Sequence, residues 1–472
     1  MKTYNQVIQN YADTETAIYR YDALKGRLLC FASLNDTANF ETHLPAVLDE
    51  FERYRLRIAE EQNRNTFFDR EQSVYDLAIN HAFQKGDYPG ALKYWEASRA
   101  RSLLKSLTDN TSTPFDLTEI QRQLPANLQV LEYSVLDDKL VAWMITNTSF
   151  TSKATDIKAS DLRAVASDYI KSISAGPRDD EKRRQLSRQL YGSLITPFQS
   201  QLDRQKALCI VPDKILSYVP FAALISPESQ QYLVADFTLL SSPSLSVLLH
   251  STAAAKIHGT GTSETLLSIG NPSFDHNEFP QLDDLPAAAK EADEIAKHYS
   301  RSYKFIGPRA LKSAIEKQLP LANVVHFAGH YVTNEALPLE SKLVLAKQQG
   351  STQSDLTVGE LVDKRLPNVK LVILSACQTS GKDYYNGEGL TGISRAFLEL
   401  GIPLVVASHW PVESESTADL MLKFHRYRKE LGLSSVAALR KAQLDLLNAP
   451  DGYFRDPYYW AAFTPFGGYT EY

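Results

Sequence analysis

Two residues that follow apolar segments could perform covalent chemistry. The segment 323–328 (NVVHFA) runs into Gly329 and His330, and the segment 369–376 (VKLVILSA) runs into Cys377. Both segments are continuous apolar runs of the kind that form buried parallel strands. Because the carboxyl ends of parallel strands meet at one edge of a sheet, the thiol and the imidazole could face each other there. Such a pair is the nucleophile and base of a cysteine hydrolase.

The two side chains would divide the work of breaking an amide bond. A free thiol has a pKa of about 8.5 and is only a few per cent thiolate at neutral pH, so a neighbouring imidazole must accept its proton. His330 would then protonate the leaving amine, and water would hydrolyse the thioester on Cys377. Backbone N–H groups of Cys377 and Tyr331 would bind the oxyanion, and Gly329 would let the backbone approach closely.

Taken singly, these residue types have plainer explanations. A lone cysteine at the end of an apolar strand is most often a small core residue, and Cys30 (in LLCFA) and Cys209 (in ALCIVP) fit that explanation well. His326 lies four residues before His330, but the glutamate of a helical zinc-protease motif is missing. Phosphate-loop, dinucleotide and serine-hydrolase motifs are missing too. We therefore expect neither a metal nor a cofactor.

The composition limits the class of protein. At roughly 150 residues per domain, 472 residues predict about three compact units. A formal charge of -6 gives no basic field that would attract nucleic acid or an anionic membrane. Three dispersed cysteines argue against a disulfide framework, and no apolar run approaches the roughly 18 residues of a membrane-spanning helix. Since the N-terminus also lacks a signal-peptide pattern, we expect a cytoplasmic protein.

The first part of the sequence has the pattern of helices. Apolar residues recur at helical spacing over 45–107, and residues 78–100 resemble one tetratricopeptide-type helical hairpin that turns at Gly86. Such a hairpin cannot bury its own apolar face, so it must pack against the rest of the chain or a partner. The segment 17–36 suits either a β-hairpin or a helix.

The pattern changes after a polar boundary at residues 108–114. Residues 128–149 predict a β-hairpin, and the amphipathic stretches 161–174 and 179–194 predict helices. The segment 251–264 is small and polar with two glycines, which predicts a linker between two α/β halves.

The last half alternates between strands and helices. Strands are expected at 266–270, 323–328, 369–376 and 402–408, and helices at 286–299, 309–318, 389–400, 414–429 and 434–447. Nearly continuous apolar strands separated by helices predict a largely parallel sheet covered on both faces.

Longer stretches of the sequence resemble the CHAT domain, a caspase-like protease family often fused to tetratricopeptide repeats. The resemblance covers about residues 125–472 and rests on VVHFAGHYVTNEALPLESKLVLA, LVILSACQTSGKDYYNGEGLTGISRAFLELGIPLVVASHWPVE, YYWAAFTPFGG, VPFAALIS and VLEYSVLDDKLVAWMI. It implies an α/β fold with a caspase-like, mostly parallel sheet flanked by helices, preceded by an α-helical, repeat-like segment. The implied parts are a mainly helical, tetratricopeptide-like region (1–114), a degenerate caspase-like half (115–260) and a catalytic half (261–472).

The resemblance also implies roles for single residues. His330 matches the family's catalytic histidine and Cys377 its nucleophile, whereas His326 matches a frequent non-catalytic position. Many members carry glycine where this chain has Tyr331, which puts the substrate's room to approach in question. Four residues are candidates for a substrate pocket, with core or solvated positions as the plainer alternative: Ser375, Asp383, Glu388 and Trp410.

The function implied by the resemblance is that of a cysteine endopeptidase with a His330/Cys377 dyad. Its partners would be a protein substrate and a protein or ligand activator, with no nucleic acid and no membrane. The family further implies a regulated bacterial defence or cell-death effector, for which a gasdermin-like protein is one implied substrate. The alternative is a catalytically silent CHAT scaffold that works by binding proteins, and Tyr331 is its best support.

Overall fold

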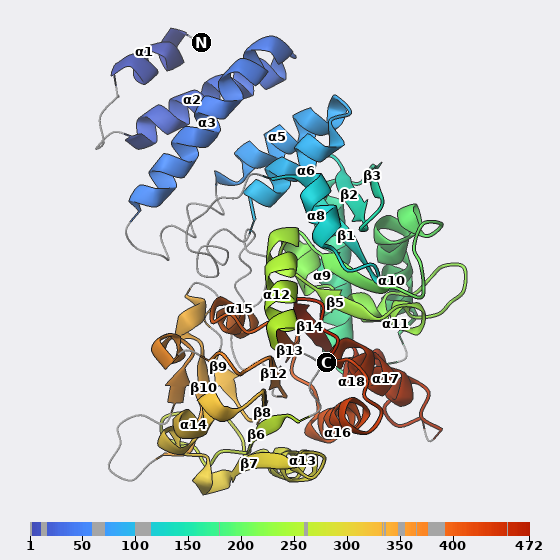
Figure 1. Ribbon diagram of the computed structural model, residues 1–472. Coiled ribbons are helices and arrows are strands. Elements are labelled where there is room, and N and C mark those ends of the chain that lie inside the picture. The colour runs from blue at the N-terminus through green and yellow to red at the C-terminus, as the bar shows by residue number, and fades with distance from the viewer. Residues whose placement is uncertain are drawn as a thin grey trace. The chain divides into compact units, whose positions relative to one another are not determined.

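The chain folds into two compact units, Met1–Ser98 and Arg99–Tyr472 (Figure 1). The computed structural model describes residues 2–10, 17–58, 71–99, 115–178, 180–258, 263–332, 334, 337–347, 355–364, 366–375, 392–450 and 452–472. Three residues predicted to belong to the site, Cys377, Asp383 and Glu388, lie outside these ranges.

The first unit is helical in its described parts. Its helices are α1 (Lys2–Asn10), α2 (Ala17–Ser33), α3 (Thr37–Arg57), α5 (Ser73–Gln84) and α6 (Tyr88–Ala97). Helix α2 shows that the segment 17–36 forms a helix and not a hairpin. Tyr21, Phe51 and Tyr75 come from three different helices and bury their rings in one core, which holds the unit together.

Helices α5 and α6 form the predicted helical hairpin. Gly86 has a φ of 78° in the turn between them, a conformation that favours glycine because it has no Cβ. Asp87 then caps α6, since its side chain accepts a hydrogen bond from the backbone N–H of Gly90.

The second unit is built on an 11-stranded sheet with the order β3-β2-β1-β4-β5-β14-β13-β12-β8-β6-β7. The strands are β1 (Leu128–Val135), β2 (Leu140–Ile145), β3 (Phe150–Thr155), β4 (Ala207–Val211), β5 (Leu239–Ser241), β6 (Thr265–Gly270), β7 (Arg301–Ile306), β8 (Val324–Ala328), β12 (Leu371–Leu374), β13 (Leu404–Ser408) and β14 (Phe463–Gly467). The two predicted α/β halves therefore share one continuous sheet.

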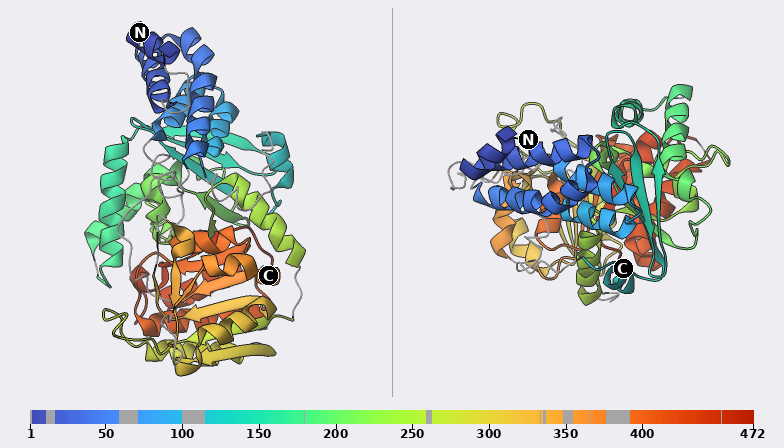
Figure 2. Two further views of the ribbon diagram at one scale, coloured as in Figure 1. Left: turned by 90° about the vertical axis from the view of Figure 1, so that its left-hand side faces the viewer. Right: turned by 90° about the horizontal axis from the view of Figure 1, so that it is seen from above.

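Five strands of the C-terminal half run in one direction in this sheet. Strands β7, β6, β8, β12 and β13 are parallel, and only β14 reverses beside β13 (Figure 2). Strands β1 and β2 form the predicted antiparallel hairpin, which β3 extends. Because β8 and β12 are parallel neighbours, their carboxyl ends lie at the same edge of the sheet.

Helices bury both faces of this sheet. One face packs into a large core with α9 (Ala159–Ser174), α10 (Glu181–Leu194), α13 (Pro286–Ala296), α16 (Ser414–Glu430), α17 (Ser435–Leu447) and α18 (Pro457–Trp460). The other face packs against α12 (Leu245–His258), α14 (Lys312–Gln318) and α15 (Gly392–Glu399). Successive strand residues point to opposite faces, so Ile373 enters the first core and Leu374 the second.

Smaller elements complete the second unit. Helix α8 (Leu117–Gln123) precedes β1, and α11 (Leu233–Asp236) precedes β5. After β8 the chain enters a three-stranded antiparallel sheet of β9 (Tyr331–Val332), β10 (Lys342–Val344) and β11 (Asp355–Thr357). Within the ranges given above, no helix has both the length and the apolar character that crossing a membrane requires.

Two features of the fold differ from the sequence-based prediction. The linker predicted at 251–264 is wrong for residues 251–258, which belong to α12. Their alanines suit a helix, and Ser251 and Thr252 are buried, so small polar residues here serve close packing. Strand β7 was not expected because its sequence, RSYKFI, is polar and half exposed, as is common at a sheet edge.

Candidate active site

His330 lies directly after β8, in a place that requires glycine before it. A β-carbon on Gly329 would lie 2.9 Å from Cδ of Pro272 and 3.0 Å from Cζ of Phe327. The backbone of β8 can pass between these side chains only without a Cβ. The carbonyl oxygen of His330 then accepts a hydrogen bond of 2.9 Å from the N–H of Val344, which ties the residue to β10.

The ring of His330 is held by a backbone group. Its Nε2 lies 2.7 Å from the carbonyl oxygen of Asp283, an acceptor, so Nε2 carries the ring proton and donates it. The edge of the ring contacts Phe274, with the two ring centroids 5.4 Å apart and the planes at 89°. Its Nδ1 is buried and has no hydrogen-bond partner among the described residues. The lone pair on Nδ1 is therefore available to accept a proton.

The surroundings of His330 keep the imidazole neutral. Burial lowers the pKa of His330 below its usual value, although the hydrogen bond to Asp283 and the negative charges of Asp283 and Asp284 act in the opposite direction. A neutral imidazole at neutral pH is the form that a general base needs.

The pairing of β8 with β12 brings together the ends of the two strands that precede His330 and Cys377 in the sequence. Phe327 is paired with Leu374, and the N–H of Ser375 donates to the carbonyl oxygen of Phe327 at 2.9 Å. His330 comes three residues after Phe327, and Cys377 comes three residues after Leu374. Neighbouring strands are about 4.8 Å apart, so Ala328 at the end of β8 and Ser375 after β12 lie at the same edge of the sheet.

A cavity adjoins the end of β12. It has a volume of about 310 Å³ and is lined by Leu285, Ala288, Glu291, Ser375, Val412, Ser414, Thr417 and Phe463. Apolar walls with a few polar groups are usual in sites that receive a side chain. Ser375, which lines this cavity, precedes the predicted nucleophile Cys377 by two residues in the sequence.

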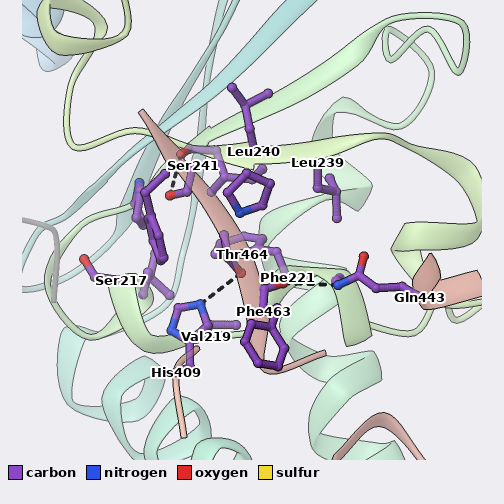
Figure 3. Close-up of a pocket in the computed structure, with 16 residues that line it drawn as sticks. Ser217, Val219, Phe221, Leu239, Leu240, Ser241, His409, Gln443, Phe463 and Thr464 are labelled. Atoms are coloured by element: carbon purple, nitrogen blue, oxygen red, sulfur yellow. Dashed lines mark hydrogen bonds between the residues drawn. The ribbon is translucent and has the colours of Figure 1, made fainter. Parts of the chain in front are cut away.

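A second cavity, of about 440 Å³, lies along β5 and β14 (Figure 3). Its lining is mostly apolar, and His409 and Thr464 are joined there by a hydrogen bond of 3.0 Å between Nε2 and Oγ1. Neither His330 nor Ser375 lines it. We therefore do not assign the predicted chemistry to this cavity.

Comparison with known proteins identifies the family. The sequence model described as "CHAT domain" matches residues 184–468, more than half of the chain. The chain belongs to the CHAT domain family. Tetratricopeptide repeat protein 28 of Mus musculus is 28% identical over 327 residues, and the protein of the same name of Homo sapiens is 27% identical over 334 residues. Each match covers 59% of this chain but only 13% of the relative's own length.

A solved structure supports the fold class. The separase-securin complex of Saccharomyces cerevisiae matches this CHAT chain with a TM-score of 0.57 and 11% sequence identity. The match covers 96% of this chain and 40% of the other. At that identity the likeness concerns the fold alone. Together with the mostly parallel sheet and its flanking helices, it confirms the predicted caspase-like α/β fold behind an α-helical segment.

Tyr331, the residue that departs from the CHAT pattern, points away from the candidate site. Its ring is only 2% exposed and packs in the core on the α14 and α15 face. Its hydroxyl lies 3.5 Å from Oγ of Ser408. The Tyr331 side chain therefore belongs to the core on that face of the sheet.

The structure brings together some of the predicted pocket residues of the CHAT domain and not others. Ser375 lines the cavity at the end of β12, whereas Trp410 lines neither cavity. Trp410 is 3% exposed, and its Nε1 donates to the carbonyl oxygen of Tyr458 at 3.1 Å. Asp383 and Glu388 lie outside the described residues, so their role, like that of the dyad, stays a prediction.

Two residues that the sequence analysis missed shape this site. Asp283 contributes a backbone oxygen, which leaves no signal in the residue type. Glu291 lies on α13 and contacts both His326 and Ser375. The one available signal for Glu291 was a glutamate on the apolar face of a predicted helix. A glutamate buried in that way almost always has a hydrogen-bonding or charged partner.

Cys209 provides a test of the prediction that Cys377 is the nucleophile. It is fully buried in β4, and burial raises the pKa of its thiol well above the usual value. We expect Cys209→Ala to destabilise the fold by about 1 kcal/mol while leaving any cleavage activity intact. Urea unfolding and a cleavage assay of the same preparation would check this. Loss of cleavage in a stably folded Cys209→Ala protein would contradict the assignment of Cys377.

Proposed function

We propose that this CHAT chain is a cysteine endopeptidase that cleaves a partner protein, with Cys377 as nucleophile and His330 as base. The observation that carries the proposal is the register of β8 and β12. Residues 330 and 377 follow the paired residues Phe327 and Leu374 by the same number of steps. Nδ1 of His330 supports the proposal because it has no hydrogen-bond partner among the described residues and is the atom that would accept the thiol proton.

The proposed reaction has two stages. Nδ1 of His330 takes the proton of the Cys377 thiol, and the thiolate attacks the carbonyl carbon of the scissile bond. The imidazolium then returns the proton to the leaving amine, and water hydrolyses the thioester. The carbonyl oxygen of Asp283 holds the ring and stabilises its positive charge at the intermediate step. Backbone N–H groups of Cys377 and Tyr331 are the proposed oxyanion donors.

The proposed partners follow from the family and from the structural neighbour. We propose a protein substrate and a protein or ligand activator, within a regulated bacterial defence or cell-death role in which a gasdermin-like protein is one candidate substrate. The structural neighbour, separase, is bound to another protein, securin. We also propose a cytoplasmic location, where reducing conditions would keep Cys377 as a thiol.

A catalytically silent scaffold is the weaker proposal. The support for a scaffold in the sequence was Tyr331, because a large side chain beside His330 could hinder the substrate. The ring of Tyr331 instead packs in the core on the α14 and α15 face of the sheet. Labelling with an electrophilic peptide ketone separates the two proposals, because a peptidase with an activated Cys377 reacts and a silent scaffold does not.

The peptidase proposal is tested by comparing newly formed peptide termini in cells that express the wild type or Cys377→Ala. New termini are expected only with the wild type, and their sequences would identify substrate and cleavage preference together. Cys30→Ala is a matched control that removes a thiol in the other unit and is expected to leave the termini unchanged. Identical termini in the wild type and Cys377→Ala would refute the proposal.

A further inference from the structure

One buried carboxylate connects the two strands that lead to the proposed catalytic pair. Glu291 of α13 is 2% exposed, and its Oε1 lies 2.9 Å from Nε2 of His326. The same oxygen accepts a hydrogen bond from Oγ of Ser375. His326 is in β8, four residues before His330, and Ser375 follows β12, two residues before Cys377.

A chain of hydrogen bonds leads from this carboxylate into the core. Nδ1 of His326 lies 3.2 Å from Nε2 of His425, and Nδ1 of His425 lies 2.8 Å from the hydroxyl of Tyr299. Nη1 of Arg428 donates to the same hydroxyl at 2.9 Å. All three rings are buried, so this chain of hydrogen bonds extends through the protein interior from α16 to the ends of β8 and β12.

The groups at the two ends of this hydrogen-bond chain determine which atom is the donor in every bond of the chain. Arg428 can only donate, and an ionised Glu291 can only accept. A neutral His326 must therefore carry its proton on Nε2, which leaves Nδ1 to accept from His425. The same reasoning places the proton of His425 on Nε2, so that Tyr299 donates to its Nδ1. Burial lowers the pKa of His425, which agrees with a single proton on that ring.

Aligned donors of this kind stabilise negative charge at their accepting end. A buried ionised carboxylate is costly unless hydrogen bonds satisfy it, and hydrogen bonds in a chain polarise one another. Glu291 receives two such bonds, one from His326 in β8 and one from Ser375 directly after β12.

We propose that Glu291 is a positioning residue for the catalytic pair: its carboxylate fixes the ends of β8 and β12 so that His330 and Cys377 meet, and the Tyr299–His425–His326 hydrogen-bond chain keeps that carboxylate oriented. The inference rests on the proposed peptidase function and adds to it a residue that does not touch the substrate's reacting atoms. Displacing either strand end by about 1 Å would be enough to lower the rate by about 10²-fold.

The first test measures Cys377 itself and needs no substrate. The rate at which iodoacetamide alkylates Cys377 is followed by mass spectrometry over a range of pH, for the wild type and Glu291→Gln. Paired with His330, the thiol is expected to react at lower pH than a free thiol. In Glu291→Gln the midpoint of the profile is expected to move toward the value of about 8.5 for a free thiol.

A matched control removes a different hydrogen bond from the same helix. Oγ of Ser268, in β6, donates to the carbonyl oxygen of Ala292 in α13 at 2.9 Å. Strand β6 carries neither member of the dyad. Ser268→Ala is therefore expected to lower the melting temperature but to leave the alkylation profile at the wild-type position.

The second test uses a peptide containing the cleavage site found from the new termini. Glu291→Gln is expected to lower kcat about 10- to 100-fold with little change in KM, since positioning affects the reacting atoms and not substrate binding. Ser375→Ala is expected to do the same in part, and Ser375→Thr, which keeps the hydroxyl, to restore the rate. Because Ser375→Ala leaves the bond from His326 to Glu291 intact, it keeps the test decisive if Glu291→Gln does not fold.

The outcomes separate the inference from the function on which it rests. A pH profile and kcat in Glu291→Gln and Ser375→Ala that match those of Ser268→Ala would overturn the positioning role while leaving the peptidase intact. A raised KM with unchanged kcat would also overturn it, since the cavity lined by Glu291 and Ser375 would then only bind substrate. Retained cleavage in Cys377→Ala would instead refute the proposed peptidase.

Discussion

Replacing His330 with alanine is expected to lower kcat/KM for the cleaved peptide by at least about 10³-fold. Nε2 of His330 is held by Asp283, and Nδ1 has no partner in the part of the chain that the structure describes, so the replacement removes the proposed proton acceptor and later proton donor. Cys377 would then ionise as an ordinary thiol and would be only a few per cent thiolate at neutral pH. A continuous cleavage assay with matched protein concentrations would measure the loss.

The pH dependence of the wild type follows from the same ring. Burial lowers the pKa of His330, so the neutral, proton-accepting form persists as pH falls below the usual histidine value of about 6.5. The acidic limb of kcat/KM is therefore expected below that value, and the limb is expected to disappear in His330→Ala.

His409 provides the control for the His330 replacement. It follows the neighbouring strand β13, its Nδ1 is also buried without a partner among the described residues, and burial lowers its pKa to about 4. His409→Ala is expected to change stability and to leave cleavage within about twofold of the wild type. Equal losses in His330→Ala and His409→Ala would contradict a specific catalytic role for His330.

The sequence predicted the strands of the site well because their apolar runs are local signals. Residues 323–328 and 369–376 correspond to β8 and β12, with the described strands slightly shorter at their ends. That the two strands would end at one edge of the same sheet was an inference from parallel topology, whereas their direct adjacency is seen only in the structure. Their register, which pairs Phe327 with Leu374, depends on packing between distant segments and could not be predicted from either run.

The polar groups around the dyad were harder to predict because they come from elsewhere in the chain. Glu291 precedes Ser375 by 84 residues in sequence, and His326 precedes His425 by 99. Periodicity could place Glu291 on the buried face of a helix, but it could not show which strands that face would meet. The backbone oxygen of Asp283 could be identified only from coordinates, because any residue type supplies the same atom.

The far end of the hydrogen-bond chain is a buried ionic cluster that anchors α16 to the sheet. Glu264, just before β6, lies 2.8 Å from Nη2 of Arg428, 3.1 Å from Nζ of Lys370 and 3.3 Å from Nζ of Lys429. Burial raises the pKa of Glu264, but these three positive charges outweigh it and lower the pKa overall. Arg428 and Lys370 are themselves at most 6% exposed, so each depends on Glu264 for its counter-charge.

Replacing Glu264 with glutamine is expected to reduce the free energy of unfolding by about 3–5 kcal/mol, because Arg428 and Lys370 would stay buried without a negative partner. Urea unfolding, read from the midpoint at constant slope, would measure the loss. Glu119→Gln is the control, since the Glu119–Arg122 pair is exposed and its removal is expected to leave the urea midpoint close to that of the wild type. Since the folded-state pKa of Glu264 is depressed, its contribution is present above the unfolded value of about 4.3 and is lost as pH falls through the folded value. Wild type and Glu264→Gln should therefore converge in stability in acid, and a constant difference at every pH would show that the ionised carboxylate is not what holds α16 to the sheet.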